Sequence, residues 1–81
     1  MIYEKIIKNY LDNYYPQNED EQTAKKAYLK LGMQEQAVIA AYLITGDYRS
    51  SAELLGTSKS TAQRNYIKAV IKLKKIWNTL Q

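Results

Sequence analysis

The sequence predicts an all-α protein, a single small domain over residues 1–81 with four to five helices, the last of them long. Apolar residues recur three and four positions apart along most of the chain, the spacing that places them on one side of a helix. No segment alternates apolar and polar residues as a half-buried strand does. The one proline and the three glycines fall between these periodic segments, where they mark helix ends.

The first predicted helix covers residues 2–14 and carries two apolar stripes. It ends before Pro16, because proline cannot donate a hydrogen bond to the helical ladder. A helix with two apolar sides needs more than one neighbour to bury them. The stripes consist of Ile2, Ile6, Tyr10 and Leu11 on one side and of Tyr3, Ile7 and Tyr14 on the other.

The second and third predicted helices form the middle of the chain. The second covers residues 19–31, with acidic residues at its N-terminal end, where the helix dipole favours them. Gly32 is a natural C-cap for it. The third, residues 34–45, is apolar nearly all round, which is typical of a helix at the centre of a core.

Two further helices are predicted after a turn at residues 46–47. A short one contains residues 52–55, and Ser50 or Ser51 can cap it. The last helix covers residues 59–79 and has one continuous apolar stripe at about 100° per residue. This stripe consists of Ala62, Tyr66, Ala69, Val70, Leu73, Ile76, Trp77 and Leu80.

The segment from Arg49 to Lys68 has the features of a helix-turn-helix. Ala52 is a small residue at the point where the second helix of the motif must cross closely. Gly56, four positions later, can adopt the left-handed conformation that a sharp turn requires. Ser58 can cap the second helix, which is rich in basic residues. Together these features predict a DNA-binding helix-turn-helix with a long C-terminal recognition helix.

The net charge of +4 is unevenly distributed along the chain. Residues 1–36 carry five lysines against six acidic residues, whereas residues 37–81 carry seven basic residues against two acidic ones. The positive excess therefore belongs to the C-terminal half. This is the electrostatic pattern of a protein that binds a polyanion such as nucleic acid.

The composition argues against an enzyme and against a bound cofactor or metal. The chain has neither cysteine nor histidine, so the commonest ligands of transition metals are missing. The first eight residues mix charged and apolar side chains, unlike a signal peptide. The longest apolar run, residues 37–44, is far shorter than a membrane span. We therefore expect a soluble, cytoplasmic protein without a membrane partner.

Several segments of the chain resemble region four, the promoter-binding C-terminal domain of bacterial sigma factors. The resemblance covers more than half of the chain and rests on residues 31–38, 52–56 and 58–61, together with Ala69, Leu73, Lys74 and Lys75. That family folds as helices around a helix-turn-helix, binds an upstream promoter element and contacts RNA polymerase. Residues 1–30 are too few for the promoter-melting domain of a complete sigma factor. The chain is therefore more similar to the small stand-alone region-four-like regulators of phages and mobile elements.

The resemblance implies a role for individual residues. Carried over by position, Ser60, Gln63 and Arg64 would face the bases. Arginine and glutamine suit this role because they bind guanine and adenine through paired hydrogen bonds. Contacts with the DNA backbone are predicted for Arg49, Ser51, Thr57, Ser58, Lys59 and Lys68.

The sequence leaves several alternatives open. A phage DNA-packaging protein of the small terminase type also combines a helix-turn-helix with helices that oligomerise, and a sigma-like module could bind polymerase without binding DNA. The N-terminal extension, residues 1–31, is predicted either to pack on residues 32–81 or to form a homodimer. Ile67 and Ile71 lie outside the apolar stripe of the last helix, at the azimuth of Ser60. We favour their burial against the N-terminal helix over exposure to a partner.

Overall fold

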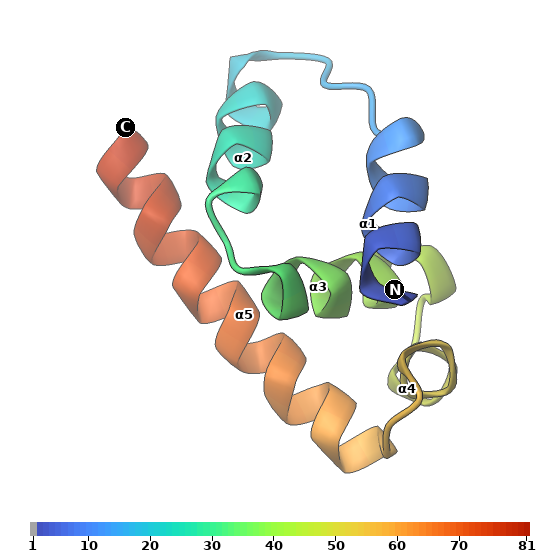
Figure 1. Cartoon of the computed structure of the whole chain (residues 1–81). Helices are drawn as coiled ribbons and strands as arrows, with labels where there is room; N and C mark the ends of the chain where they lie inside the picture. Colours follow the sequence, from blue (N-terminus) through green and yellow to red (C-terminus); the bar gives the residue numbers. More distant parts are fainter. Residues whose placement is uncertain (1) are drawn as a thin grey trace.

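The computed structural model describes residues 2–81, and this part of the chain forms five helices and no strand (Figure 1). The all-α class is confirmed, and every predicted helix is present. No helix among residues 2–81 is both long enough and apolar enough to cross a membrane. The helices are α1 (Ile2–Asp12), α2 (Glu19–Leu29), α3 (Met33–Thr45), α4 (Tyr48–Leu55) and α5 (Lys59–Leu80).

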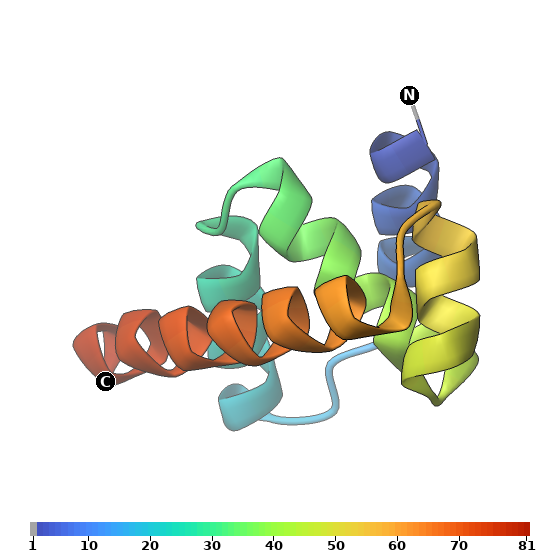
Figure 2. The ribbon, with the colours of Figure 1, turned by 90° about the horizontal axis from the view of Figure 1, so that it is seen from below.

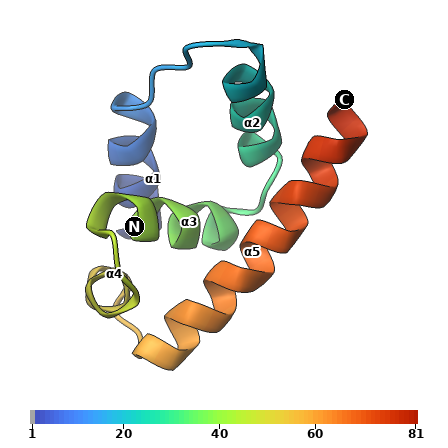
Figure 3. The same ribbon diagram turned by 180° about the vertical axis from the view of Figure 1, so that it is seen from behind.

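Helix α3 lies at the centre of the molecule, with α1, α4 and α5 packed around it (Figures 1 and 3). Its residues 37–41 are all buried, and the three alanines among them, Ala37, Ala40 and Ala41, are 0% exposed. Alanine has a short side chain, so neighbouring helices can approach the α3 backbone closely. The prediction of a central third helix is therefore confirmed.

Two apolar clusters hold the other helices to this centre. Tyr28, Leu31, Ile39 and Ala69 join α2 and its C-terminal end to α3 and α5. A second cluster joins Ile6 of α1 to the alanines of α3, and Leu54 and Leu55 of α4 pack against it. Residues 2–31 therefore pack on the rest of the same chain, which is one of the two predicted arrangements. A homodimer stays a prediction.

Hydrogen bonds fix the connection between α2 and α3. The hydroxyl of Tyr28 donates to the backbone carbonyl of Gln36 at 2.7 Å, and the side-chain amide of Gln36 donates to the carbonyl of Leu31 at 2.8 Å. Burial raises the pKa of Tyr28 well above its ordinary value, so the hydroxyl keeps its proton for this bond. The two bonds satisfy polar groups that would otherwise be buried without partners.

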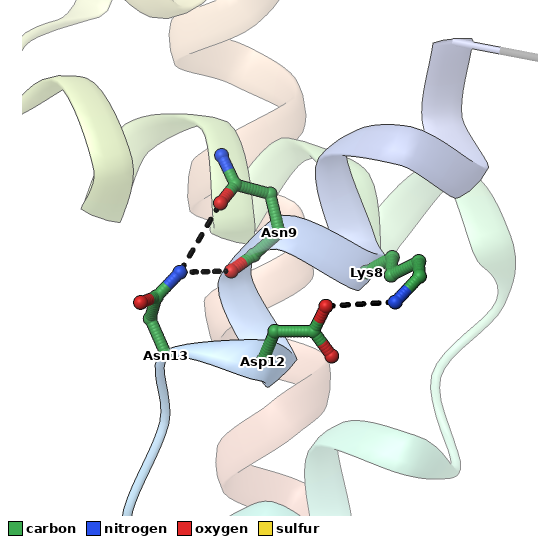
Figure 4. A network of polar contacts seen from close by, with 4 residues as sticks. All are labelled: Lys8, Asn9, Asp12 and Asn13. Carbon is green, nitrogen blue, oxygen red and sulfur yellow. Dashed lines mark hydrogen bonds and ion pairs between the residues drawn. The ribbon is translucent and has the colours of Figure 1, made fainter.

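Helix α1 ends at Asp12, two residues earlier than predicted, and side chains on its last turn account for this (Figure 4). The amide of Asn13 donates to the backbone carbonyl of Asn9 at 2.8 Å and to the Asn9 side chain at 3.2 Å. The backbone N–H of Asn13 donates to the carbonyl of Tyr10, three residues back. Lys8 and Asp12 form an ion pair at 2.8 Å beside this turn, and the pair raises the pKa of Lys8. The tightened turn closes the helix before the proline is reached.

The predicted C-cap of the second helix is wrong. Gly32 is the N-cap of α3, with an extended backbone (φ −67°), and its N–H donates to the Glu35 carboxylate at 2.9 Å. Helix α2 ends earlier, at the cap residue Lys30, whose N–H donates to the carbonyl of Ala27 at 3.1 Å. The pairing of Glu35 with the Gly32 N–H decides between the two roles, because it satisfies a free N–H at the start of α3.

The predicted cap of the fourth helix is wrong as well. Asp47, not Ser50 or Ser51, is the N-cap of α4, and its carboxylate accepts a hydrogen bond from the Ser50 N–H at 2.6 Å. Gly46 ends α3 in the left-handed conformation (φ 85°), so Asp47 follows at once and α4 begins at Tyr48. An aspartate in this position also interacts favourably with the helix dipole.

The left-handed conformation of Gly46 leads to a prediction about stability. We expect Gly46→Ala to lower the free energy of unfolding by about 1–2 kcal/mol, because an L side chain is strained at positive φ. Gly32→Ala is the control for backbone strain, since Gly32 has a negative φ that alanine adopts freely; its Cβ would lie 3.3 Å from Glu35 Oε1, at the end of a flexible side chain that can shift, so it should cost less. Urea unfolding of both variants measures the difference. Equal losses would show that the conformation at Gly46 is not the cause.

Candidate nucleic-acid interface

A three-residue turn, residues 56–58, joins α4 to α5. Gly56 is left-handed (φ 73°), as predicted, and its N–H donates back to the carbonyls of Ala52 and Glu53. The Ser58 side chain accepts a hydrogen bond from the Thr61 N–H at 3.2 Å and so caps α5, also as predicted. In Figure 1, α4 is seen end-on while α5 runs across the view, so the two helices cross steeply. The chain therefore forms a helix, a sharp turn and a second helix.

Small residues and a tyrosine cluster fix how α5 crosses the other helices. Ala52 and Ala62 are both buried, as predicted for the crossing point. Tyr66 of α5 packs against Tyr42 of α3 and Tyr48 of α4, with ring centroids 4.3 and 5.8 Å away. Burial raises the pKa of Tyr66. Offset and edge-on ring contacts of this kind hold the three helices in one relative orientation.

The side of α5 opposite to this packing is exposed along its whole length. Ser60, Gln63 and Arg64, the residues predicted to face bases, all lie on it. Their side chains make no hydrogen bond or ion pair with other described residues. We call this side the outer face of α5, and it consists of Ser60, Gln63, Arg64, Ile67, Lys68, Ile71, Lys74 and Lys75.

The charge of α5 is concentrated on this outer face. The helix contains six basic residues and no acidic one. Lys72 lies off the outer face, and its ammonium group pairs with Glu35 of α3 at 3.0 Å. Within residues 2–81, none of the other five takes part in an ion pair: Lys59, Arg64, Lys68, Lys74 and Lys75. Four of these five, Arg64, Lys68, Lys74 and Lys75, lie on the outer face, which is therefore an uncompensated positive surface that attracts polyanions.

Most of the predicted backbone-contacting residues border the N-terminal end of α5. Thr57, Ser58 and Lys59 are exposed at the turn, and Lys68 is exposed about two and a half turns further along α5. Arg49 is exposed on α4 and lines a surface hollow together with Lys59. Four of these predicted residues thus lie around the N-terminal end of the outer face, and Lys68 lies on the face itself.

Ser51 does not fit its predicted role in backbone contact. Its side chain is only 2% exposed, and its hydroxyl donates to the carbonyl of Tyr48 at 3.1 Å. Its backbone N–H donates to the carbonyl of Asp47. A polar group that is buried and already bonded in this way has nothing left to offer a phosphate, and we leave Ser51 out of the interface.

The predicted burial of Ile67 and Ile71 is wrong. Their side chains are 44% and 50% exposed, and they interrupt the basic outer face of α5. The N-terminal helix that was expected to cover them packs on α3 instead. Helix α2, not α1, lies beside α5, on the side of its apolar stripe.

Some of the residues that build the interface escaped the sequence analysis. Tyr42 and Tyr48 showed no pattern that links them to Tyr66, because ring contacts between separate helices leave no local signal. The pairing of Glu35 with Lys72 is equally non-local. The cap at Asp47 could have been found, since an aspartate directly after a helix-ending glycine is a common start signal.

Compared with known protein families, with curated proteins and with solved structures, the chain matches none of them. The similarity to sigma region four thus stays a prediction. In the described part of the chain, no three carboxylate side chains come together as a metal site. The interface therefore rests on its own geometry and charge.

Two carboxylates beside the interface have depressed pKa values. The Gly32 N–H and the Lys72 ammonium lower the pKa of Glu35, and the Ser50 N–H lowers the pKa of Asp47. A carboxyl group whose pKa is depressed by folding stabilises the folded state above its ordinary pKa. That contribution is lost as the pH falls through the depressed value.

We therefore expect the free energy of unfolding to decrease as the pH is lowered from about 5 toward 3. A double variant, Glu35→Gln with Asp47→Asn, should show a flatter dependence because both titrating groups are gone. Urea unfolding at several pH values measures the two slopes. Parallel slopes in the variant and the original protein would contradict the role of these carboxylates.

Proposed function

We propose that this protein is a sequence-specific regulator of transcription that binds double-stranded DNA, with the N-terminal half of α5 in the major groove. The observation that supports this best is the outer face of α5, which is exposed, positively charged and unpaired within residues 2–81. The major groove is about 12 Å wide and admits an α-helix. Duplex DNA supplies the negative charge that the face lacks.

Ser60, Gln63 and Arg64 occupy positions i, i+3 and i+4 of α5, so they face one strip of the groove floor. We assign base contacts to these three. Arg64 has the geometry for two hydrogen bonds to a guanine, and Gln63 for two to an adenine. Ser60 can pair with either a donor or an acceptor. Sequence preference in this proposal comes mainly from Arg64 and Gln63.

The remaining residues hold the DNA backbone. Thr57 and Lys59 lie at the start of α5, where free backbone N–H groups and the helix dipole favour a phosphate. Ser58 contributes by capping this helix end. Arg49 lies beside the same end, where it lines a surface hollow with Lys59, and Lys68 lies further along α5; we assign a phosphate contact to each. These contacts set the position and affinity and carry no sequence information.

The resemblance to sigma region four extends the proposal to the type of regulator, its place in the cell and a second partner. We propose a regulator of phage or mobile-element type that acts in the cytoplasm, with RNA polymerase as a second partner. Only the N-terminal half of one helix contacts bases in this proposal, so either the polymerase or a second copy of the chain would have to add affinity.

The role of Arg64 can be tested by selecting binding sites from random duplex DNA. We expect one sequence to be enriched, and Arg64→Ala to relax the preference at one position by about 1–3 kcal/mol. Arg64→Lys keeps the charge but loses the paired hydrogen bonds, so it should retain much of the affinity and lose the preference. Absence of binding even at low salt would reject the proposal in favour of a module that binds polymerase alone.

The role of Lys68 can be tested by the salt dependence of binding. We expect Lys68→Ala to weaken binding uniformly across sequences and to reduce the slope of log K against log salt by about 1. Lys26→Ala is the matched control, because Lys26 is an exposed lysine on α2, outside the interface. If both variants changed the slope equally, the attraction would be a property of the net charge and not of this face.

A further inference from the structure

The exposed pair Ile67 and Ile71 has no role in the contacts assigned so far. Both lie on the outer face of α5, 44% and 50% exposed, with Arg64, Lys68 and Lys74 around them. The apolar stripe of α5 that packs in the core lies on the other side of the helix, so folding leaves these two isoleucines exposed. What sets this pair apart from other exposed apolar side chains is its place on the basic face of α5, where a partner that meets the cations would also meet the isoleucines.

The surrounding charge restricts what that partner can be. A second copy meeting this face would bring two sets of unpaired cations together, and like charges across an interface are unfavourable. A polyanion has the opposite sign and suits the face. The major groove of duplex DNA presents one apolar group at its base edges, the 5-methyl group of thymine. The isoleucines and the cations therefore fit one and the same partner.

The spacing along the helix places Ile67 within the groove. Ser60, Gln63, Arg64 and Ile67 follow the pattern i, i+3, i+4, i+7, which base-contacting residues use when a helix lies in the major groove. Ile67 lies about 10 Å beyond Ser60 at about 1.5 Å per residue. This distance corresponds to about three base pairs. Ile71 lies one turn further, toward the edge of the groove.

We propose that Ile67 packs on the 5-methyl group of a thymine, so that the target site carries a T·A pair about three base pairs from the base that faces Ser60. Ile71 shields the same methyl group from water on its outer side. The inference rests on the proposed DNA binding and adds one specific base to it.

Removing the methyl group from the DNA tests this inference directly. Each thymine of the selected site is replaced in turn by deoxyuridine, which differs only by that methyl group. We expect one replacement to weaken binding about fourfold, the ratio that corresponds to about 0.8 kcal/mol per buried methyl group. With Ile67→Ala the same replacement should have no effect, and with Ile71→Ala a reduced one.

Ile44→Ala is the matched control, because Ile44 is an isoleucine of α3 with 41% exposure. It should keep the full fourfold effect. Circular dichroism checks that the variants remain helical, which we expect since all three side chains are largely exposed.

The possible outcomes separate this inference from the proposed function. If the protein binds a defined sequence but no deoxyuridine replacement matters, or if the effect persists in Ile67→Ala, the thymine contact is refuted while DNA binding stands. If Ile67→Ala dissociates a dimer measured by sedimentation, the pair is a self-association surface and the inference is also refuted. If no duplex is bound at all, both proposals fail.

Discussion

The structure depends on the close approach of other helices to α3. Ala37, Ala40 and Ala41 are fully buried, and bulkier side chains at these positions would push α1, α4 and α5 away from the centre. A chain of 81 residues can build only a modest core, so a defect at these alanines would remove a large part of the packing that holds the helices together. The crossing of α4 and α5 is therefore set by a helix that takes no part in the outer face itself.

The same central helix explains why one side of α5 remains exposed to solvent. Three features hold α5 against its neighbouring helices: the buried Ala69, the tyrosine cluster around Tyr66, and the ion pair of Lys72 with Glu35. Together they fix the rotation of α5 about its own axis. A helix held in this way presents a constant set of side chains to its surroundings, as recognition by a rigid element requires. Figure 2 shows how far α5 extends across the molecule, with α4 beside its N-terminal end.

Local signals in the sequence sufficed for the helices and for the turn of the helix-turn-helix. Gly56 and Ser58 act through their own backbone and their immediate neighbours, so their roles could be predicted. Ile67 was misplaced because its environment depends on which helix α1 packs against, and periodicity does not encode the choice between α3 and α5. Ser51 was misplaced for a related reason, since α4 begins earlier than its serines suggested and turns this hydroxyl inward. The exposure of Ser60, Gln63 and Arg64 followed correctly from the apolar stripe, whereas their assignment to base contacts stays a proposal.

The outer face of α5 has an energetic cost that the fold alone does not explain. Cations spaced along one helix face repel one another, and isoleucines that stay about half exposed gain less from folding than buried ones. A surface selected only for stability would exchange some of these lysines for glutamates and form i, i+4 ion pairs, as Lys8 and Asp12 do on α1. Residues that break a local rule without a structural gain are expected at functional sites. In the proposed complex duplex DNA would offset both costs, because its phosphates would neutralise the cations and a thymine methyl group would cover apolar side chains. The surface that is least favourable in the isolated protein is thus the one to which we assign the proposed DNA contact.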